Sequence, residues 1–170
     1  FIVIMCWFNH KKYWFNLFSF FDYSFTMPAF FINPLSEEHI DLLNKLDEQN
    51  QDLRVFISDK NSKDFIDKIP GKKAIGDITD DSHISTASEG AYCGIFFEES
   101  NYKLSDIYLN AIQNSNLQRI LWISKEEPRN NILEIDNLTY IKYSGENDYF
   151  DTVLNLEEVE EVNEKFIDLK

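Results

Sequence analysis

Cysteine and histidine are scarce in this chain. It has two cysteines, Cys6 and Cys93, which lie far apart, and three histidines, His10, His39 and His83, which do not cluster. The spacings of a disulfide framework or a zinc site are therefore absent, and we expect no metal. So few cysteines are typical of a protein that works in the reducing cytoplasm.

Basic residues are also in short supply. The chain has 16 lysines and arginines against 30 aspartates and glutamates, which gives a formal net charge of -14 over 170 residues. A surface this acidic repels phosphate backbones and anionic membranes, so neither nucleic acid nor a lipid surface is an expected partner. The simplest interpretation of the charge is solubility.

No stretch offers the roughly 20 apolar residues that a membrane span needs. Residues 1–26 are crowded with aromatic side chains, but they have no strand or helix period and are interrupted by Lys11 and Lys12. The chain begins with Phe1, and Met27 directly precedes a strand-like run. We interpret residues 1–26 as an upstream leader outside the domain, with a membrane-directing segment or an extra packed element as alternatives. Residues 27–170 suffice for one domain with its own core.

What the chain does contain is a regular alternation of two patterns from Pro28 onward. Short apolar runs bounded by turn residues predict buried strands, and apolar residues at helical spacing predict helices. The predicted strands are residues 28–32, 53–58, 73–78, 91–97, 119–123 and 138–143, and the predicted helices are residues 36–50, 61–69, 81–89, 104–114 and 148–161.

Such an order predicts a three-layer α/β sandwich: a mostly parallel sheet of about six strands, in the order 3-2-1-4-5-6, with helices on both faces. Ser36 is a good N-cap for the first helix, with Glu37 and Glu38 in its first turn, and Asp81 or Ser82 would cap the third helix. Ligands of such sheets bind beyond the carboxyl ends of the strands, between strands one and four.

Three segments resemble the atypical short-chain dehydrogenase/reductase group, which includes NmrA-like proteins and NAD-dependent sugar epimerases. QDLRVFISDK is similar to the second strand of that group, and NLQRILWIS to its fifth. GDITDDSHISTASEGAYCGIFF is similar to its third strand, helix and fourth strand, and carries a Gly-Asp-x-Thr-Asp signature. The resemblance runs from Phe30 to Ser124 and implies a Rossmann-like domain that binds NAD or NADP.

The resemblance also implies where a dinucleotide would lie. The positions of the three phosphate-loop glycines fall at Asn33, Ser36 and His39. The residue that reads the ribose falls at Ser58 or Asp59, and Asp59 would suit a free 2′-hydroxyl and therefore NAD. The remaining implied contacts are Asp77 and Ile78 beside the adenine, Phe96, Phe97 and Glu98 beside the ribose and nicotinamide, and Ser124 at or near the catalytic serine.

Two features that the chemistry of this group requires are missing from the sequence. None of the three phosphate-loop positions is glycine, and a β-carbon there obstructs the close approach of a pyrophosphate. No tyrosine lies between Lys125 and Asn137, where the catalytic Tyr-x-x-x-Lys helix should follow, and Tyr108 has no lysine four residues later. Hydride transfer to a carbonyl needs such a positioned proton donor.

Carboxylates are expected around the same site. Each would repel a pyrophosphate by about 1 kcal/mol per charge pair at 4 Å in bulk water, and by more where it is partly buried. The acidic residues that open the first helix or follow strands are Glu37, Glu38, Asp59, Asp77, Glu98, Glu99 and Glu126. We therefore expect an acidic crevice.

These observations favour a non-catalytic NmrA-like Rossmann domain that acts by weak nucleotide binding or through a protein partner, including a second copy. The alternative is a small NAD(P)-dependent oxidoreductase or epimerase-like enzyme with an unconventional phosphate loop. A receiver-type phosphorylation domain shares the alternating order, and Asp77 and Lys125 could imitate two of its site residues. However, Asn33-Pro34-Leu35 supplies no acid after the first strand.

Some side chains that could carry chemistry have simpler interpretations. We interpret His39 as a partly exposed helix residue and His83 as part of a short helix. Cys93, Trp122 and the Phe96-Phe97 pair fall in apolar strands, so we expect them to pack in the core.

Overall fold

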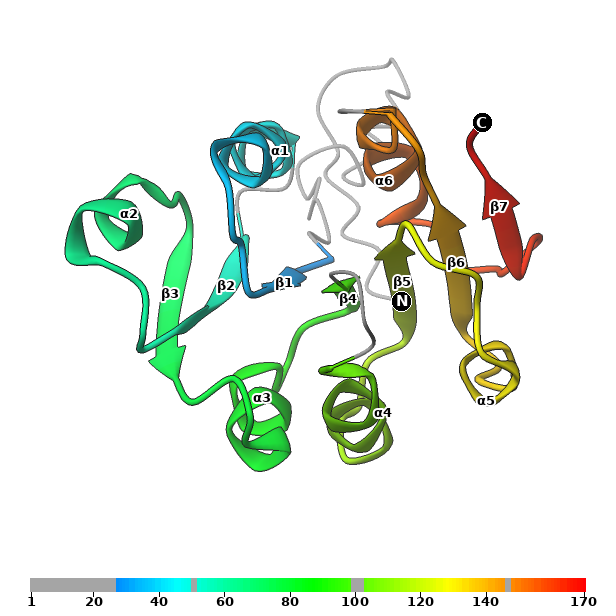
Figure 1. Cartoon of the computed structure of the whole chain (residues 1–170), viewed down its shortest axis with the longest axis horizontal. Helices are drawn as coiled ribbons and strands as arrows, with labels where there is room; N and C mark the ends of the chain where they lie inside the picture. The colour runs from blue at the N-terminus through cyan, green and yellow to red at the C-terminus, as the bar shows by residue number, and fades with distance from the viewer. Residues whose placement is uncertain (1–26, 50–51, 99–102, 146–147) are drawn as a thin grey trace, which may run out of the picture.

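The computed structural model of the chain describes residues 27–49, 52–98, 103–145 and 148–170. Within them, seven parallel strands form one sheet in the order β3-β2-β1-β4-β5-β6-β7 (Figure 1). The strands are β1 (Ala29–Ile32), β2 (Arg54–Ser58), β3 (Lys72–Gly76), β4 (Cys93–Glu98), β5 (Arg119–Ser124), β6 (Leu138–Lys142) and β7 (Phe166–Asp168). The helices are α1 (Glu37–Gln49), α2 (Lys63–Lys68), α3 (Asp81–Ala87), α4 (Ser105–Gln113), α5 (Asn130–Leu133) and α6 (Phe150–Leu156). The predicted fold class and the order of the first six strands are confirmed.

Helices lie on both faces of the sheet, with α1, α2 and α6 on one side and α3, α4 and α5 on the other (Figure 1). Each side has its own apolar core, and the strands contribute to both. In β1, for example, Phe31 packs on the α1 side while Phe30 packs on the α3 and α4 side. A parallel sheet covered on both faces needs apolar residues at every strand position. This need explains why β1, β4 and β5 are continuous buried runs.

The turn between α2 and β3 shows how a glycine ends an element here. Gly71 has a φ of 75°, and an added β-carbon would lie 2.6 Å from the carbonyl oxygen of Leu53. The chain therefore reverses tightly after Pro70, and the amide of Lys72 donates to that same carbonyl at 2.8 Å. The predicted stop at Pro70-Gly71 is confirmed.

The C-terminal segment differs from the prediction. Helix α6 ends at Leu156 and not at residue 161. Its last turn has no basic residue, and the sequence continues as EEVEE, whose charge is unfavourable at a helix C-terminus. The chain instead reaches the sheet edge as the three-residue strand β7, which was not predicted, and neither was the four-residue helix α5. Elements this short show no readable hydrophobic period.

Arg119 ties the C-terminal segment to the sheet. Its side chain is 1% exposed, and its Nε donates to the carbonyl of Leu156, the last residue of α6, at 3.3 Å. An Nη nitrogen of Arg119 donates to the hydroxyl of Thr139 at 2.9 Å, and that hydroxyl donates to the carbonyl of Glu164 at 2.7 Å. These bonds hold the last residue of α6 at the amino ends of β5 and β6. The first residues of α6 therefore lie toward the carboxyl ends of the strands.

The predicted aromatic leader, residues 1–26, lies outside the described residues, so its separation from the domain stays a prediction. Among the helices in the described ranges, none combines the length and the apolar character needed to cross a membrane.

Candidate functional site

The candidate site lies at the carboxyl end of the sheet centre, where β1 has β2 on one side and β4 on the other. The chain continues from β1 into α1 and from β4 toward α4, and these two helices lie on opposite faces of the sheet (Figure 1). Rossmann-like sheets hold their ligands at such a switch point. Here it is surrounded by the β1–α1 loop, the end of β4 and the start of α6.

Asn33 begins the β1–α1 loop at the position expected for the first phosphate-loop glycine. Its φ is 56°, a left-handed conformation that glycine adopts freely and that asparagine tolerates better than most residues. Its amide donates to the carbonyl of Phe56 at 2.8 Å. The residue is 5% exposed, and its Oδ1 accepts no hydrogen bond from the described residues. Asn33 therefore keeps the backbone shape of a glycine while its side chain fills the loop.

Ser36 and His39 form a reciprocal cap at the start of α1. The hydroxyl of Ser36 lies 3.4 Å from the amide of His39, which donates to it. The imidazole of His39 reaches back, and its Nδ1 accepts from the amide of Leu35 at 2.9 Å. This arrangement resembles the Ser-x-x-Glu capping box, but histidine replaces the acid and accepts from the amide of Leu35, the residue before the N-cap Ser36. Two loop amides that could face a ligand are thereby satisfied from within the chain.

His39 is buried, so its predicted partial exposure was wrong. Its side chain is 3% exposed, and its ring meets Phe97 edge-on at 4.0 Å between centroids, with Phe31 at 5.8 Å. Burial lowers its pKa from the usual 6.5 to about 4. The imidazole is therefore neutral at pH 7, as a Nδ1 that accepts a hydrogen bond requires.

His39 belongs to a set of ring side chains that we call the aromatic cluster: Phe31, His39, Phe97, Tyr143 and Tyr149. Tyr149, at the start of α6, lies 4.7 Å from Tyr143 and 5.8 Å from Phe97 between centroids, and it is fully buried. Burial raises its pKa, and the Glu38 carboxylate raises it further. The cluster fills the α1 side of the switch point with the protein's own side chains.

The positions expected around the adenosine lie at the ends of β2 and β3. Ser58 is buried, and its hydroxyl accepts from the amide of Lys60 at 3.3 Å. Asp59 is exposed, and its amide donates to the carbonyl of Gly76 at 2.9 Å, which brings the two strand ends together. Ile78 is 8% exposed and packs in the core on the α3 side. Of Ser58, Asp59 and Ile78, only Asp59 presents an exposed side chain.

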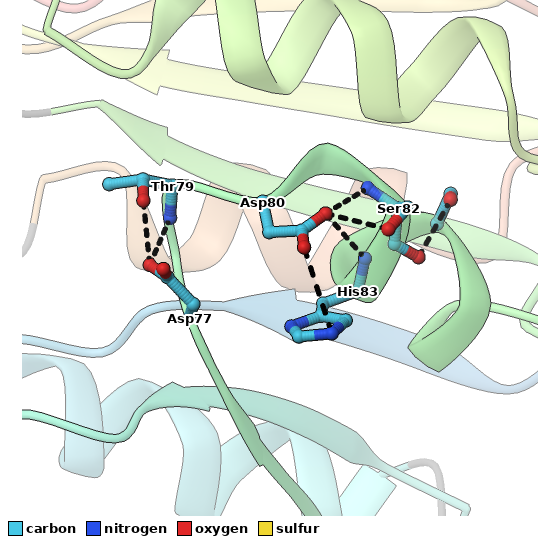
Figure 2. A network of polar contacts seen from close by, with 6 residues as sticks. Asp77, Thr79, Asp80, Ser82 and His83 are labelled. Carbon is cyan, nitrogen blue, oxygen red and sulfur yellow. Dashed lines mark hydrogen bonds and ion pairs between the residues drawn. The ribbon is translucent and has the colours of Figure 1, made fainter.

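The Gly-Asp-x-Thr-Asp signature forms a turn and a helix cap (Figure 2). Asp77 accepts from the amide of Thr79 at 2.9 Å and from its hydroxyl at 2.7 Å. These bonds lower the pKa of Asp77. Asp80 caps α3 by accepting from the amide and hydroxyl of Ser82, at 3.0 and 2.6 Å, and from the amide of His83 at 3.4 Å. The cap is therefore Asp80, and the prediction of Asp81 or Ser82 was wrong.

The end of β4 does not present its acid to the crevice. Glu98 is 2% exposed; the hydroxyl of Ser105 donates to one of its oxygens, and the indole of Trp122 donates to the other at 2.9 Å. Burial raises its pKa, an effect that the Trp122 bond partly offsets. Two further contacts were expected here: Phe96 is 1% exposed and stacks on Trp122, and Phe97 is 6% exposed and lies in the aromatic cluster. Glu98 therefore anchors α4 to the sheet, and Glu99 lies outside the described residues.

Ser124, the expected catalytic serine, ends β5 opposite Glu98. It is fully buried, and its hydroxyl accepts from the amide of Glu126 at 3.1 Å. The chain then turns through the four-residue helix α5, Asn-Asn-Ile-Leu, before β6. The segment between β5 and β6 thus holds no tyrosine–lysine pair to position a proton.

The described residues do not fit a dinucleotide placed in the manner of the resemblance. In the β1–α1 loop, Pro34 has no amide hydrogen, and the amides of Asn33 and Leu35 donate within the chain. The third glycine position carries a buried imidazole, His39. A pyrophosphate needs open amides and close backbone approach, and this loop offers neither at these residues.

Sequence reasoning missed the roles of His39, Tyr149 and Trp122. The Ser-x-x-His spacing at Ser36 could have indicated the cap, because a capping box is defined by that spacing. Nothing in the sequence indicated that Tyr149 would meet Phe97, since their contact depends on how α6 docks.

No protein-family model matches the chain, and no curated protein matches it in sequence. Its fold is similar to that of a short-chain dehydrogenase/reductase from Veillonella parvula DSM 2008 (TM-score 0.54, 12% identity, 69% of each chain covered). It is also similar to a putative epimerase from Bacteroides thetaiotaomicron (TM-score 0.52, 15% identity, 70% of each chain covered). A third similar structure is a Rossmann-fold NAD(P)-binding family protein from Shigella flexneri (TM-score 0.52, 13% identity, 69% of this chain and 68% of that one).

The match is less complete against some longer proteins. The chain spans 51% of the length of gox2253, to which it is similar with a TM-score of 0.53 and 10% identity. At such low identities the likeness concerns the fold alone. The predicted resemblance is confirmed at that level: the chain has a Rossmann-like fold of the kind found in short-chain dehydrogenases/reductases and epimerases.

Proposed function

We propose that this chain is a non-catalytic Rossmann-like domain of the NmrA-like type that acts as a binding protein. The observation that carries the proposal is the connection from β5 to β6. In the group that the sequence resembles, a Tyr-x-x-x-Lys helix follows the fifth strand, whereas here a single turn, α5, stands there. Without a positioned proton donor, hydride transfer to a carbonyl loses its general acid.

Two further observations support the same proposal. The hydroxyl of Ser124 is fully buried and already accepts a hydrogen bond, so a substrate would have to displace the strand end to reach it. In the β1–α1 loop the amides of Asn33 and Leu35 donate within the chain, which disfavours tight binding of a pyrophosphate at these residues. We therefore propose that the chain acts through contact with a protein partner, which includes a second copy of itself, and weak nucleotide binding is the other mode of action that we propose.

The buried free thiol of Cys93 is compatible with the cytoplasmic location that we propose.

Calorimetric titration with NAD, NADH, NADP and NADPH tests the proposal. We expect no heat of binding, or binding no tighter than about millimolar, which corresponds to roughly -4 kcal/mol. Sedimentation of the same sample at increasing concentration would detect a second copy as partner. Micromolar binding of any of the four dinucleotides would contradict the proposed binding mode.

The second candidate is a small NAD(P)-dependent oxidoreductase or epimerase-like enzyme with an unconventional phosphate loop. The similarity to a dehydrogenase/reductase and to a putative epimerase favours it. This candidate predicts micromolar affinity for one dinucleotide, with a preference for NAD if Asp59 reads the ribose. An Asp59→Ala variant would then lose affinity for NAD. An unchanged affinity would remove Asp59 from the site.

A further inference from the structure

His39 is the residue of the β1–α1 turn that differs most from its counterpart in a nucleotide-binding loop. It takes the third glycine position of the resemblance, yet it carries one of the larger side chains of α1 and is 3% exposed. Its Nδ1 lies 2.9 Å from the amide nitrogen of Leu35, which donates to it. Amides at the start of a helix are the groups that bind phosphate oxygens in other proteins.

The rest of the imidazole is enclosed by apolar rings. Phe97 meets it edge-on from β4, and Phe31 lies beside it on β1. Tyr149 in turn contacts Phe97, with 5.8 Å between ring centroids, and is itself fully buried. A planar ring with one acceptor nitrogen is thus bound on several sides and hydrogen-bonded at its edge, as a small ligand would be.

We infer that the His39 imidazole is a built-in ligand of the β1–α1 loop, supplying the acceptor that a phosphate oxygen supplies to such loops in nucleotide-binding proteins. Removal of this side chain should therefore open a site at the loop. That site would bind a small hydrogen-bond acceptor of about the size of imidazole. The inference concerns the loop that the proposed function also describes. It rests on the proposed function in one respect, because both assume that no dinucleotide occupies the β1–α1 loop.

Ligand rescue of a cavity variant tests this inference. We expect His39→Ala to lower the melting temperature by about 5–10 °C, because a buried ring and its hydrogen bond are lost. Adding about 100 mM imidazole near pH 8, where the free base predominates, should restore about 3 °C by binding the folded variant. A melting temperature of His39→Ala that does not respond to imidazole would overturn the inference.

Two matched variants separate a specific site from a general effect of the additive. His39→Gln keeps a side-chain acceptor at the start of α1, as in an ordinary capping box, and fills part of the space, so imidazole should not stabilise it. His83→Ala removes the exposed histidine of α3 and should behave as the wild type does. Equal stabilisation of all four proteins would show that imidazole does not act at the loop.

The tautomer of His39 gives a readout that does not depend on a folded cavity variant. In a His10→Gln/His83→Gln background, His39 is the single histidine left, and its two ring nitrogens can be observed by nitrogen-15 NMR. We expect an unprotonated Nδ1 and a protonated Nε2 at neutral pH. A protonated Nδ1 could not accept from Leu35 and would overturn the inference. Titration with the dinucleotides tests the proposed function separately, since the absence of a catalytic helix does not depend on His39.

Discussion

Two turns at the same edge of the sheet begin a helix in different ways. The β1–α1 turn (residues 33–39) is capped by Ser36 and the neutral ring of His39, and much of it is buried. The β3–α3 turn (residues 77–83) is capped by the charged carboxylate of Asp80 and leaves His83 exposed. A carboxylate is costly to bury unless it is fully paired, so the buried turn uses neutral groups. In these two turns the neutral cap is the more buried one and the charged cap is the more exposed one, as the cost of burying a charge predicts.

The largest expected effect concerns the pH dependence of the buried turn. Burial lowers the pKa of His39 to about 4 in the folded protein, against 6.5 for an ordinary histidine. The unfolded chain therefore binds more protons between these values, so stability should fall as the pH falls from 6.5 toward 4. The full difference corresponds to roughly 3 kcal/mol of unfolding free energy.

Urea unfolding at a series of pH values between these limits measures this effect. His39→Gln keeps an acceptor and has no titrating ring, so its stability should depend less on pH. His83→Ala, the matched change in the exposed turn, should retain the wild-type dependence. If His39→Gln and the wild type lose stability in parallel, the comparison between the two turns is wrong.

The next effect concerns the backbone of the buried turn. Asn33→Ala and Asn33→Gly both remove the buried Oδ1 that accepts no hydrogen bond from the described residues. They differ in that alanine resists a φ of 56° and glycine does not. We expect the glycine variant to be more stable than the alanine variant by about 1 kcal/mol. Equal midpoints in denaturant would mean that the left-handed conformation of Asn33 is not required.

A smaller effect is expected for the cap of the exposed turn. Asp80→Ala removes the acceptor of two amides and one hydroxyl at the start of α3. The melting temperature should fall by about 2–4 °C, as for other N-cap losses in a domain of this size. Asp80→Ser keeps a capping oxygen and should recover most of the loss. A melting temperature unchanged in Asp80→Ala would indicate that α3 is held by packing alone.

The smallest effect is expected for His83. Its Nε2 lies 3.7 Å from an oxygen of Asp80, and the two side chains are 56% and 41% exposed, so the pair is screened by water and salt. His83→Ala should shift the melting temperature by less than about 1 °C. A loss as large as that of His39→Ala would mean that the exposed turn carries more of the stability than its contacts indicate.

Much of the fold could be predicted from local patterns. Runs such as AFFI in β1 and ILWI in β5 are apolar at every position, which identifies strands covered on both faces. Helices with apolar residues at helical spacing separate them, and that alternation determines a parallel sheet with right-handed crossovers. The strands and helices that were missed, β7 and α5, are too short to show a period.

The sequence alone also determined two absences at the candidate site: glycine at the phosphate-loop positions and a tyrosine–lysine pair after the fifth strand. Only the tertiary structure decided how the remaining residues are used. It buries His39 against Phe97, turns Glu98 toward Trp122, and brings Tyr149 into the aromatic cluster. Whether a polar side chain is exposed to a ligand or consumed in the core depends on contacts between residues far apart in the chain, and local sequence patterns do not contain that information.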